Sequence, residues 1–306
     1  MPSFKNFKIL IFFIMTFLLL AQWADSQESA TPQENFIKIT DRLYMLKGAG
    51  CNIASLLGQD GVLLIDSGAQ NQSAMVVSTM KEITDAPVRM VINTHYHFDH
   101  AGGNEAFARK GAITISHLNT RNRMTQEWRV PEIMGIKYPT IPPYPEICLP
   151  KITFDESLTI HFNDEIIHVT HIPGGHSDSD IIIQFRKANV IHTGDLYLSN
   201  GFPVIDFFYG GSVNGYIAAV GEIIQICNEN TRIIPGHGPL SNREELITYR
   251  DMLVKARDRI VNMIEEGQTL EEIVTADPIS ELCKGGKSWL PPKMYIYCVY
   301  HEFSNQ

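Results

Sequence analysis

A dense group of histidine and aspartate residues is the strongest indication in this sequence of what the chain forms. The apolar segment Met90–Asn93 is a predicted strand that leads directly into Thr94-His95-Tyr96-His97-Phe98-Asp99-His100. Four potential metal ligands leave this strand end within six residues: His95, His97, Asp99 and His100. In an extended segment the first two project to the same side, whereas the turn implied by the following glycines redirects the other two. One loop can therefore serve two neighbouring cations.

Two ligands from one loop do not complete a metal site, so further donors must come from other strand ends. Three candidates follow apolar strands and are embedded in glycine: His176 in Pro173-Gly174-Gly175-His176-Ser177, Asp195 in Thr193-Gly194-Asp195-Leu196, and His237 in Pro235-Gly236-His237-Gly238. Glycine lets the backbone bend and approach closely, and strand-end loops on a rigid scaffold are where catalytic groups are expected. Imidazole nitrogens and carboxylate oxygens suit zinc, iron or manganese, and zinc is preferred where no redox ligand is evident.

The order of elements predicts an α/β fold with two similar halves. The first half has predicted strands at Phe36–Thr40, Arg42–Leu46, Asn52–Leu57, Val62–Asp66, Val88–Asn93 and Ala112–Ile115, with helices at Gln72–Thr84 and Gly103–Lys110. The second half has predicted strands at Leu158–Phe162, Ile166–His171, Ile181–Phe185, Val190–His192 and Thr231–Ile234, with a helix at Val213–Cys227. A four-layer αββα sandwich would bury both faces of such strands. No linker separates the halves, so residues 27–306 are expected to form one domain.

Two further segments have recognisable patterns. Val130–Pro150 contains six prolines, which forbid an ordinary helix or central strand. It is either a semi-rigid flap over a pocket or a surface crossover between the halves. Later, Ser241-Asn242-Arg243-Glu244 reads as a capping box for a long helix through about Glu265.

The first 26 residues resemble a secretory signal peptide. Lys5 and Lys8 precede the apolar run Ile9–Leu20, which Ala24-Asp25-Ser26 follows. This run is short against the roughly 20 apolar residues of a membrane-spanning helix, and a retained N-terminal anchor is the alternative. We expect residues 1–26 to be removed and the mature chain to be periplasmic or secreted, without stable membrane insertion. Removal moves the net charge from −9 to −10, which disfavours nucleic acid as a partner.

The cysteines do not suggest a disulfide framework or a structural zinc knuckle. The chain has five, and none forms a C-x-x-C pair. Buried free thiols are expected, and the alternative is a single disulfide between Cys283 and Cys298.

The whole mature chain resembles the metallo-β-lactamase superfamily of hydrolases. The resemblance rests on His95-x-His97-x-Asp99-His100, followed in order by His176, Asp195 and His237. It implies that the ligands divide between two zinc ions, although iron or manganese would also fit. The implied ligands of the first ion are His95, His97 and His176, those of the second are Asp99, His100 and His237, and Asp195 bridges both. Asp66 would orient the ligand loop from behind, or be an ordinary turn residue.

A two-metal site of this kind predicts hydrolysis of a small acyl substrate. Two cations lower the pKa of a shared water, so that a metal-bound hydroxide attacks the carbonyl, and Asp99 is a candidate proton shuttle. A β-lactam is the first choice, because Gly174–Asp180 is similar to the Gly-His-Thr-x-Asp-Asn stretch of the main β-lactamase subclass. However, Asp195 and Leu198 stand where that subclass usually has a metal-binding cysteine and a substrate-binding lysine.

Alternatives to β-lactam hydrolysis therefore remain. The segments around Asp195 and His237 look more like those of lactonases and of glyoxalase II, so lactones and thioesters are the other acyl substrates. An iron-dependent oxidoreductase with the same fold is the second class of function. No pattern in the sequence indicates the oligomeric state.

Several aromatic residues are candidates for the mouth of the site. They are Phe202, Phe207, Phe208, Tyr209 and Trp289, each of which either lines the pocket or packs in the core. Tyr197 either donates to the substrate carbonyl or points into the core. The other six histidines (His117, His161, His168, His171, His192 and His301) are expected to be structural.

Overall fold

The computed structural model describes residues 35–199, 201–283 and 290–304. The predicted signal peptide and Trp289 lie outside these residues. The chain divides into two compact units, residues 1–36 and 37–306, and the following description concerns the second. No described helix combines the length and the apolar character that crossing a membrane requires.

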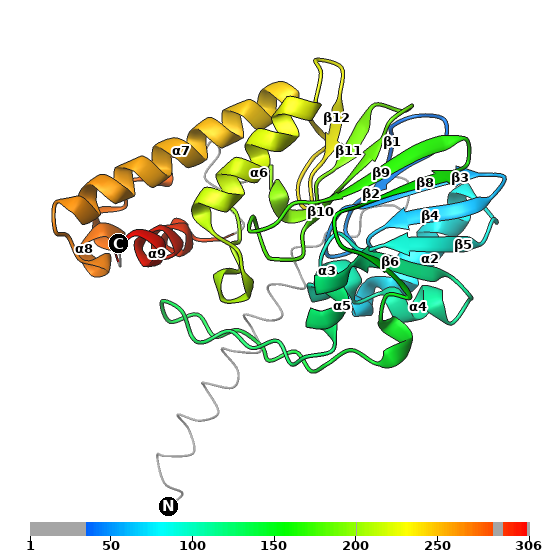
Figure 1. Ribbon diagram of the computed structural model, residues 1–306, viewed down its shortest axis with the longest axis horizontal. Helices are drawn as coiled ribbons and strands as arrows, with labels where there is room; N and C mark the ends of the chain where they lie inside the picture. The colour runs from blue at the N-terminus through cyan, green and yellow to red at the C-terminus, as the bar shows by residue number, and fades with distance from the viewer. Residues whose placement is uncertain (1–34, 200, 284–289, 305–306) are drawn as a thin grey trace, which may run out of the picture. The chain divides into compact units, whose positions relative to one another are not determined.

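Two β-sheets form the centre of this unit (Figure 1). The first sheet has the order β1-β2-β3-β4-β5-β6-β7, with β1 Phe36–Lys38, β2 Leu43–Leu46, β3 Ile53–Gly58, β4 Gly61–Ile65, β5 Val88–Ile92, β6 Ile113–His117 and β7 Ile152–Phe154. The second has the order β13-β12-β11-β10-β9-β8, with β8 Ser157–Phe162, β9 Glu165–His171, β10 Ile181–Phe185, β11 Val190–His192, β12 Arg232–Ile234 and β13 Ser241–Asn242. Pairing is parallel from β4 to β7 and between β11 and β12.

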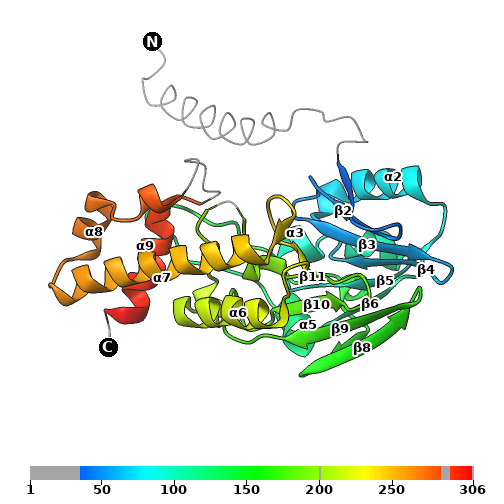
Figure 2. The ribbon, with the colours of Figure 1, turned by 90° about the horizontal axis from the view of Figure 1, so that it is seen from above.

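Helices cover the outer faces of both sheets (Figures 1 and 2). The first sheet carries α2 Ser73–Ile83, α3 Phe98–Ala101, α4 Asn104–Ala108 and α5 Leu118–Met124. The second half carries α6 Val213–Ile226, α7 Arg243–Glu265, α8 Leu270–Ala276 and α9 Pro292–Phe303. Short 3₁₀ turns are η2 Gln70–Gln72, η3 Glu146–Cys148, η4 Gly194–Leu196, η5 Phe207–Tyr209 and η6 Ser280–Leu282.

The apolar core explains this layering. One cluster lies between the sheets and joins Leu63 and Ile65 of β4 with Ile183 and Phe185 of β10. A second cluster joins the outer face of the second sheet to α6, α7 and α9. Every residue of β4 is buried, as expected for a strand that is covered on both faces. The predicted αββα sandwich is confirmed.

Some local predictions need correction. The N-cap of α7 is Asn242, whose side chain accepts a hydrogen bond from the Glu245 backbone N–H at 3.0 Å. The predicted capping box is therefore one residue too early, because Ser241 is paired in β13 and donates instead to the Glu245 carboxylate at 2.5 Å. All five cysteines are free. The alternative Cys283–Cys298 disulfide is wrong, and both thiols pack against the apolar cluster of the second half.

The proline-rich segment between α5 and β7 is a long irregular hairpin. Its two arms pair between Trp128 and Ile141. Its tip reaches the C-terminal helix, where the Lys293 ammonium donates to the Met134 carbonyl at 3.2 Å. In Figure 1 this segment extends from α5 as a long hairpin. We call residues 125–151 the flap segment.

Candidate metal centre

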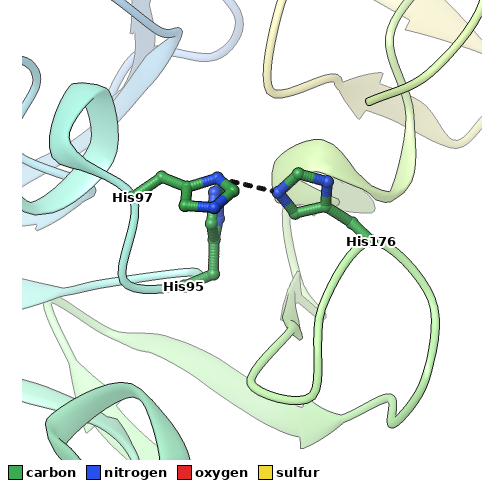
Figure 3. A group of neighbouring side chains, drawn as sticks. All are labelled: His95, His97 and His176. Carbon is green, nitrogen blue, oxygen red and sulfur yellow. Dashed lines mark hydrogen bonds between the residues drawn. The ribbon is translucent and has the colours of Figure 1, made fainter. Parts of the chain in front are cut away.

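Three imidazoles from two loops meet at one point (Figure 3). His95 and His97 follow β5, and His176 lies in the turn between β9 and β10. A nitrogen of each ring lies within 4.8 Å of the others, and Nε2 of His176 is 3.0 Å from Nδ1 of His97.

Hydrogen bonds on the far side of each ring decide which nitrogen faces this point. His97 Nε2 donates to Asp206 at 2.8 Å, and His176 Nδ1 donates to the Val204 carbonyl at 2.8 Å. The facing nitrogens of these two rings are therefore both lone-pair acceptors. Two acceptors 3.0 Å apart in a buried position repel each other unless a proton or cation lies between them. His95 Nε2 is also buried and makes no hydrogen bond among the described residues.

A second group of donors lies beside the first. Asp99, His100 and His237 each place one ligand atom within 4.8 Å of the others. His237 Nε2 is 3.3 Å from Asp99 Oδ2 and 3.3 Å from His100 Nε2. His237 follows β12, and Asn52 fixes its loop by donating to the carbonyls of Pro235 and Gly238 at 2.8 Å.

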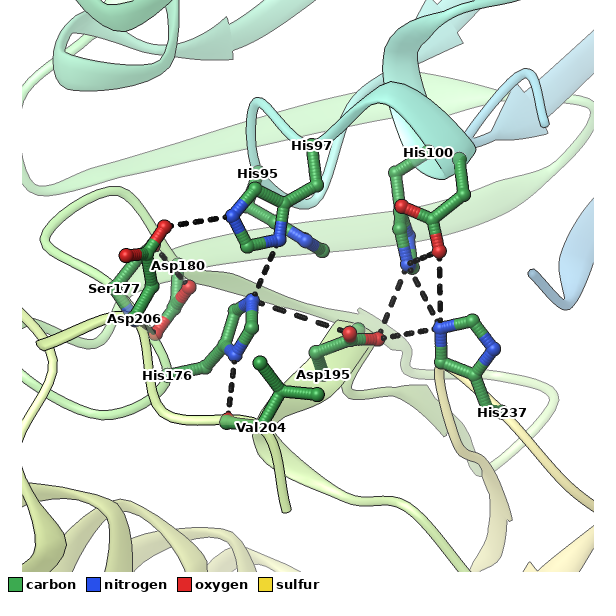
Figure 4. A network of polar contacts seen from close by, with 12 residues as sticks. His95, His97, His100, His176, Ser177, Asp180, Asp195, Val204, Asp206 and His237 are labelled. Atoms are coloured by element: carbon green, nitrogen blue, oxygen red, sulfur yellow. Dashed lines mark hydrogen bonds and ion pairs between the residues drawn. The ribbon is translucent and has the colours of Figure 1, made fainter. Parts of the chain in front are cut away.

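Asp195 lies between the two groups (Figure 4). Its Oδ1 is 3.1 Å from His100 Nε2 and 3.4 Å from His237 Nε2, while its Oδ2 is 3.9 Å from His176 Nε2. Oδ1 is buried without a hydrogen bond among the described residues. A Cβ at Gly236 would approach this oxygen to 2.0 Å, which explains the glycine before His237.

The structure thus brings all seven predicted ligands together at one end of the sheets. Their nitrogen and oxygen atoms suit zinc and related cations, and the facing acceptors and the two unpaired buried atoms fit two such ions. The division of ligands between two ions stays a prediction.

Other side chains fix the ligands from behind. Asp66, predicted to orient the loop, accepts from His100 Nδ1 at 2.8 Å and from the Thr94 backbone N–H at 2.7 Å. The Thr94 hydroxyl donates to Asp66 at 2.8 Å and lies 3.1 Å from His95 Nδ1. These contacts direct Nε2 of His95 and His100 toward the centre, which is the usual arrangement behind metal-binding imidazoles.

Sequence reasoning missed Asp206. One of its carboxylate oxygens accepts from His97 Nε2 at 2.8 Å, from Trp128 Nε1 at 3.1 Å and from the Tyr96 hydroxyl. It therefore connects a predicted ligand to the flap segment. The only signal was a single acidic residue inside the apolar run Val204–Phe208, where a side chain of this kind needs partners once it is buried.

Asp206→Asn is expected to weaken metal binding or activity by roughly 10- to 100-fold, since outer partners of metal-binding histidines have effects of this size. The amide keeps the volume but removes the charge that holds the His97 tautomer. Zinc affinity from a chelator competition would measure the loss. Unchanged affinity and unchanged turnover would contradict the positioning role.

The pKa values of several side chains in the cluster are strongly shifted when no cation is bound. Burial, helped by the neighbouring His97 charge, lowers the pKa of His176 to about 4. Burial also acts to lower the pKa of His237, but the Asp195 and Asp99 carboxylates outweigh it and raise this pKa to about 9. Burial opposes ionisation of Asp195, yet His237 and His100 hold its pKa well below the usual range.

Metal binding is therefore expected to release protons at neutral pH. His237 has a folded-state pKa of about 9, so it is protonated at pH 7 and must lose this proton to bind a cation. Zinc affinity should fall as the pH is lowered from 9 toward 6, because protons compete more strongly for the ring. Calorimetric titrations in two buffers of different ionisation enthalpy would count the protons, and no release at pH 7 would contradict this expectation.

The aromatic candidates separate into core and surface positions. Tyr197 is buried, and its hydroxyl lies 2.9 Å from Ser241 Oγ, so it belongs to the core and is not a substrate donor. Phe202 stacks on Tyr295 at 4.9 Å. Phe207 packs against the second core cluster and Phe208 is exposed. Tyr209 stacks on Trp128, with centroids 6.4 Å apart.

Several remaining histidines have structural contacts. His192 contacts the Asn52 carbonyl at 3.1 Å, His117 the Asp155 carbonyl at 2.7 Å, and His171 the Asp178 carbonyl at 3.0 Å. His168 lies 3.0 Å from the Thr159 hydroxyl on the neighbouring strand.

A family model described as the metallo-beta-lactamase superfamily matches residues 48–237. The chain belongs to this superfamily and is a metal-dependent hydrolase.

Two curated relatives have different activities in their names. Metallo-beta-lactamase IND-1 of Chryseobacterium indologenes is 26% identical over 239 residues, which cover 75% of this chain and 91% of that protein. Acyl-coenzyme A thioesterase MBLAC2 of Gallus gallus is 24% identical over 229 residues, which cover 68% of this chain and 79% of the relative. At these identities the names do not fix the substrate of this chain.

Solved structures share the fold. The sec-alkylsulfatase Pisa1 of Pseudomonas sp. has a TM-score of 0.67 at 17% identity, and the match covers 88% of this chain and 50% of that one. The chain thus spans about half the length of the sulfatase. The metallo-beta-lactamase of Pontibacter korlensis has a TM-score of 0.56 at 18% identity, with 71% of this chain and 97% of that one covered.

Proposed function

We propose that this chain is an exported zinc hydrolase of a small acyl substrate, with a β-lactam as the first substrate to test. The observation that carries the proposal is the set of facing nitrogen and oxygen atoms on His97, His176, His100 and Asp195, a cluster that two cations would satisfy. The relative metallo-beta-lactamase IND-1, which aligns with this chain over 91% of its own length, supports the choice of substrate.

The chemistry follows from the residues that surround the centre. Two zinc ions held by the seven ligands would supply Lewis acidity toward a carbonyl and a water of lowered pKa. Burial acts to raise the pKa of Asp99, but His100 and His237 outweigh it and lower this pKa, so the carboxylate is ionised at neutral pH. An ionised carboxylate can accept a proton, and we assign Asp99 the transfer of a proton to the leaving group.

A thioester is the second candidate substrate. Leu198, which stands where a substrate-binding lysine is usual in the main β-lactamase subclass, is buried beside His237. This position therefore offers no cation for the carboxylate that β-lactams carry. The thioesterase relative, aligned over 79% of its length, supports this alternative.

The direct test is hydrolysis by the zinc-loaded chain lacking residues 1–26. A chromogenic cephalosporin, a thioester and a lactone would be assayed with and without chelator, beside His97→Ala. His168→Ala is the matched control, because this histidine lies on β9 and contacts Thr159. We expect turnover of at least one substrate in the wild type and control, and none with chelator or in His97→Ala.

Other results would reject the proposal. Full activity of His97→Ala would rule out the assigned centre. Iron near one equivalent with little zinc in the purified protein would instead favour the oxidoreductase alternative. N-terminal sequencing of the exported chain tests export, with cleavage expected near Ser26 and an intact Met1 contradicting it.

A further inference from the structure

The flap segment reaches the predicted metal centre through the side chain of Trp128. The Trp128 indole N–H donates to Asp206 Oδ2 at 3.1 Å, and the same oxygen accepts from His97 Nε2 at 2.8 Å. The Trp128 and His97 rings also meet edge to face, with their centroids 5.8 Å apart. A residue of the flap segment thus shares one carboxylate oxygen with a predicted metal ligand.

The Asp206 carboxylate depends on its hydrogen-bond donors. Its side chain is only 4% exposed, and a buried charge is costly unless it is hydrogen-bonded. Oδ2 also accepts from the Tyr96 hydroxyl. Loss of the indole N–H would leave this buried anion with one donor fewer, and its orientation would be less firmly held. Because Asp206 directs the His97 ring, such a change reaches the nitrogen that faces the metal centre.

Backbone pairing and Tyr209 fix Trp128 above Asp206. The Trp128 and Ile141 backbones pair in both directions at 2.9 Å. The Tyr209 ring stacks on Trp128, while its hydroxyl accepts from the Arg129 N–H at 2.9 Å and donates to the Arg129 carbonyl at 3.1 Å. The Tyr209 N–H donates to the Asp206 carbonyl at 2.9 Å. The start of the flap segment and Asp206 are therefore held in one arrangement.

We propose that Trp128 is a positioning residue that couples the order of the flap segment to occupancy of the metal centre, acting through Asp206 on His97. Such a coupling is reciprocal, so the contact that strengthens zinc binding is itself strengthened by zinc to the same extent. The proposal rests on the proposed function for the identity of the ion. It gives the flap segment a role in metal retention.

The first test is a double-mutant cycle on zinc affinity, measured by chelator competition. Trp128→Phe should weaken zinc binding about fivefold, the effect of one hydrogen bond. In the Asp206→Asn background the same substitution should change the affinity by less than about twofold, because the carboxylate through which it acts is gone. Gln126→Ala is the matched control and should bind zinc like the wild type, since Gln126 is exposed and lies two positions before Trp128.

Hydrogen exchange of the flap amides gives a readout that a merely structural role would not change. In the wild type, zinc should slow exchange of the Trp128 and Ile141 backbone N–H groups about fivefold, matching the effect on affinity. In Trp128→Phe and in Asp206→Asn, zinc should leave the exchange rates of the amides at positions 128 and 141 unchanged.

Three results would overturn the proposal. They are equal zinc affinity in wild type and Trp128→Phe, a fivefold loss that persists in full in the Asp206→Asn background, and wild-type exchange at Trp128 and Ile141 that zinc does not affect. All these measurements are made without turnover. Zinc binding without hydrolysis would therefore reject only the proposed function, whereas failure of the wild type to bind zinc would reject both proposals.

Discussion

Asp195→Asn is expected to reduce hydrolysis by roughly a thousandfold or more, because the loss of the predicted bridging ligand would remove several kcal/mol of stabilisation. Asp195 approaches His100 and His237 through one oxygen and His176 through the other. The amide has nearly the same volume, but one oxygen becomes an NH₂ group that cannot bind a cation. Turnover and zinc content per chain would be measured together.

Asp251→Asn is the matched control for this change, since Asp251 is exposed on α7 and pairs only with the adjacent Arg250 among the described residues. We expect it to retain wild-type turnover and zinc content. Two equivalents of zinc together with full turnover in Asp195→Asn would show that Asp195 does not bridge the ions.

Metal removal is expected to lower the melting temperature by roughly 10 °C, since a ligand at a thousand times its Kd stabilises a fold by about 4 kcal/mol. Without cations, the acceptors of His97 and His176 face each other at 3.0 Å, and the buried atoms His95 Nε2 and Asp195 Oδ1 have no hydrogen-bond partner among the described residues. Calorimetry before and after chelation, followed by zinc addition, would measure the shift. An unchanged melting temperature would indicate that the cluster satisfies itself with protons.

The clustering of the candidate ligands was predictable because their sequence signal is local. His95, His97, Asp99 and His100 lie in one short segment, and each remaining ligand follows an apolar strand with glycine beside it. The order of elements also predicted the layered architecture, because apolar residues recur at different spacings in buried strands and in amphipathic helices.

Features that depend on long-range contacts were not predictable. Asp206 lies 109 residues from His97, and no sequence pattern near Asp206 identifies His97 as its partner. The position of Tyr144 depends on how the flap segment folds back against Met124. Helices α5, α8 and α9 were missed as well, and in α8 and α5 the seven-residue length leaves little periodic signal.

The most direct test of the two-metal account is a zinc titration of the metal-free chain with bound zinc counted per protein. The account predicts a plateau at two equivalents in the wild type and at one in His237→Ala, whose side chain contacts Asp99 and Asp195 at 3.3 and 3.4 Å. A plateau at one equivalent in both proteins would contradict it.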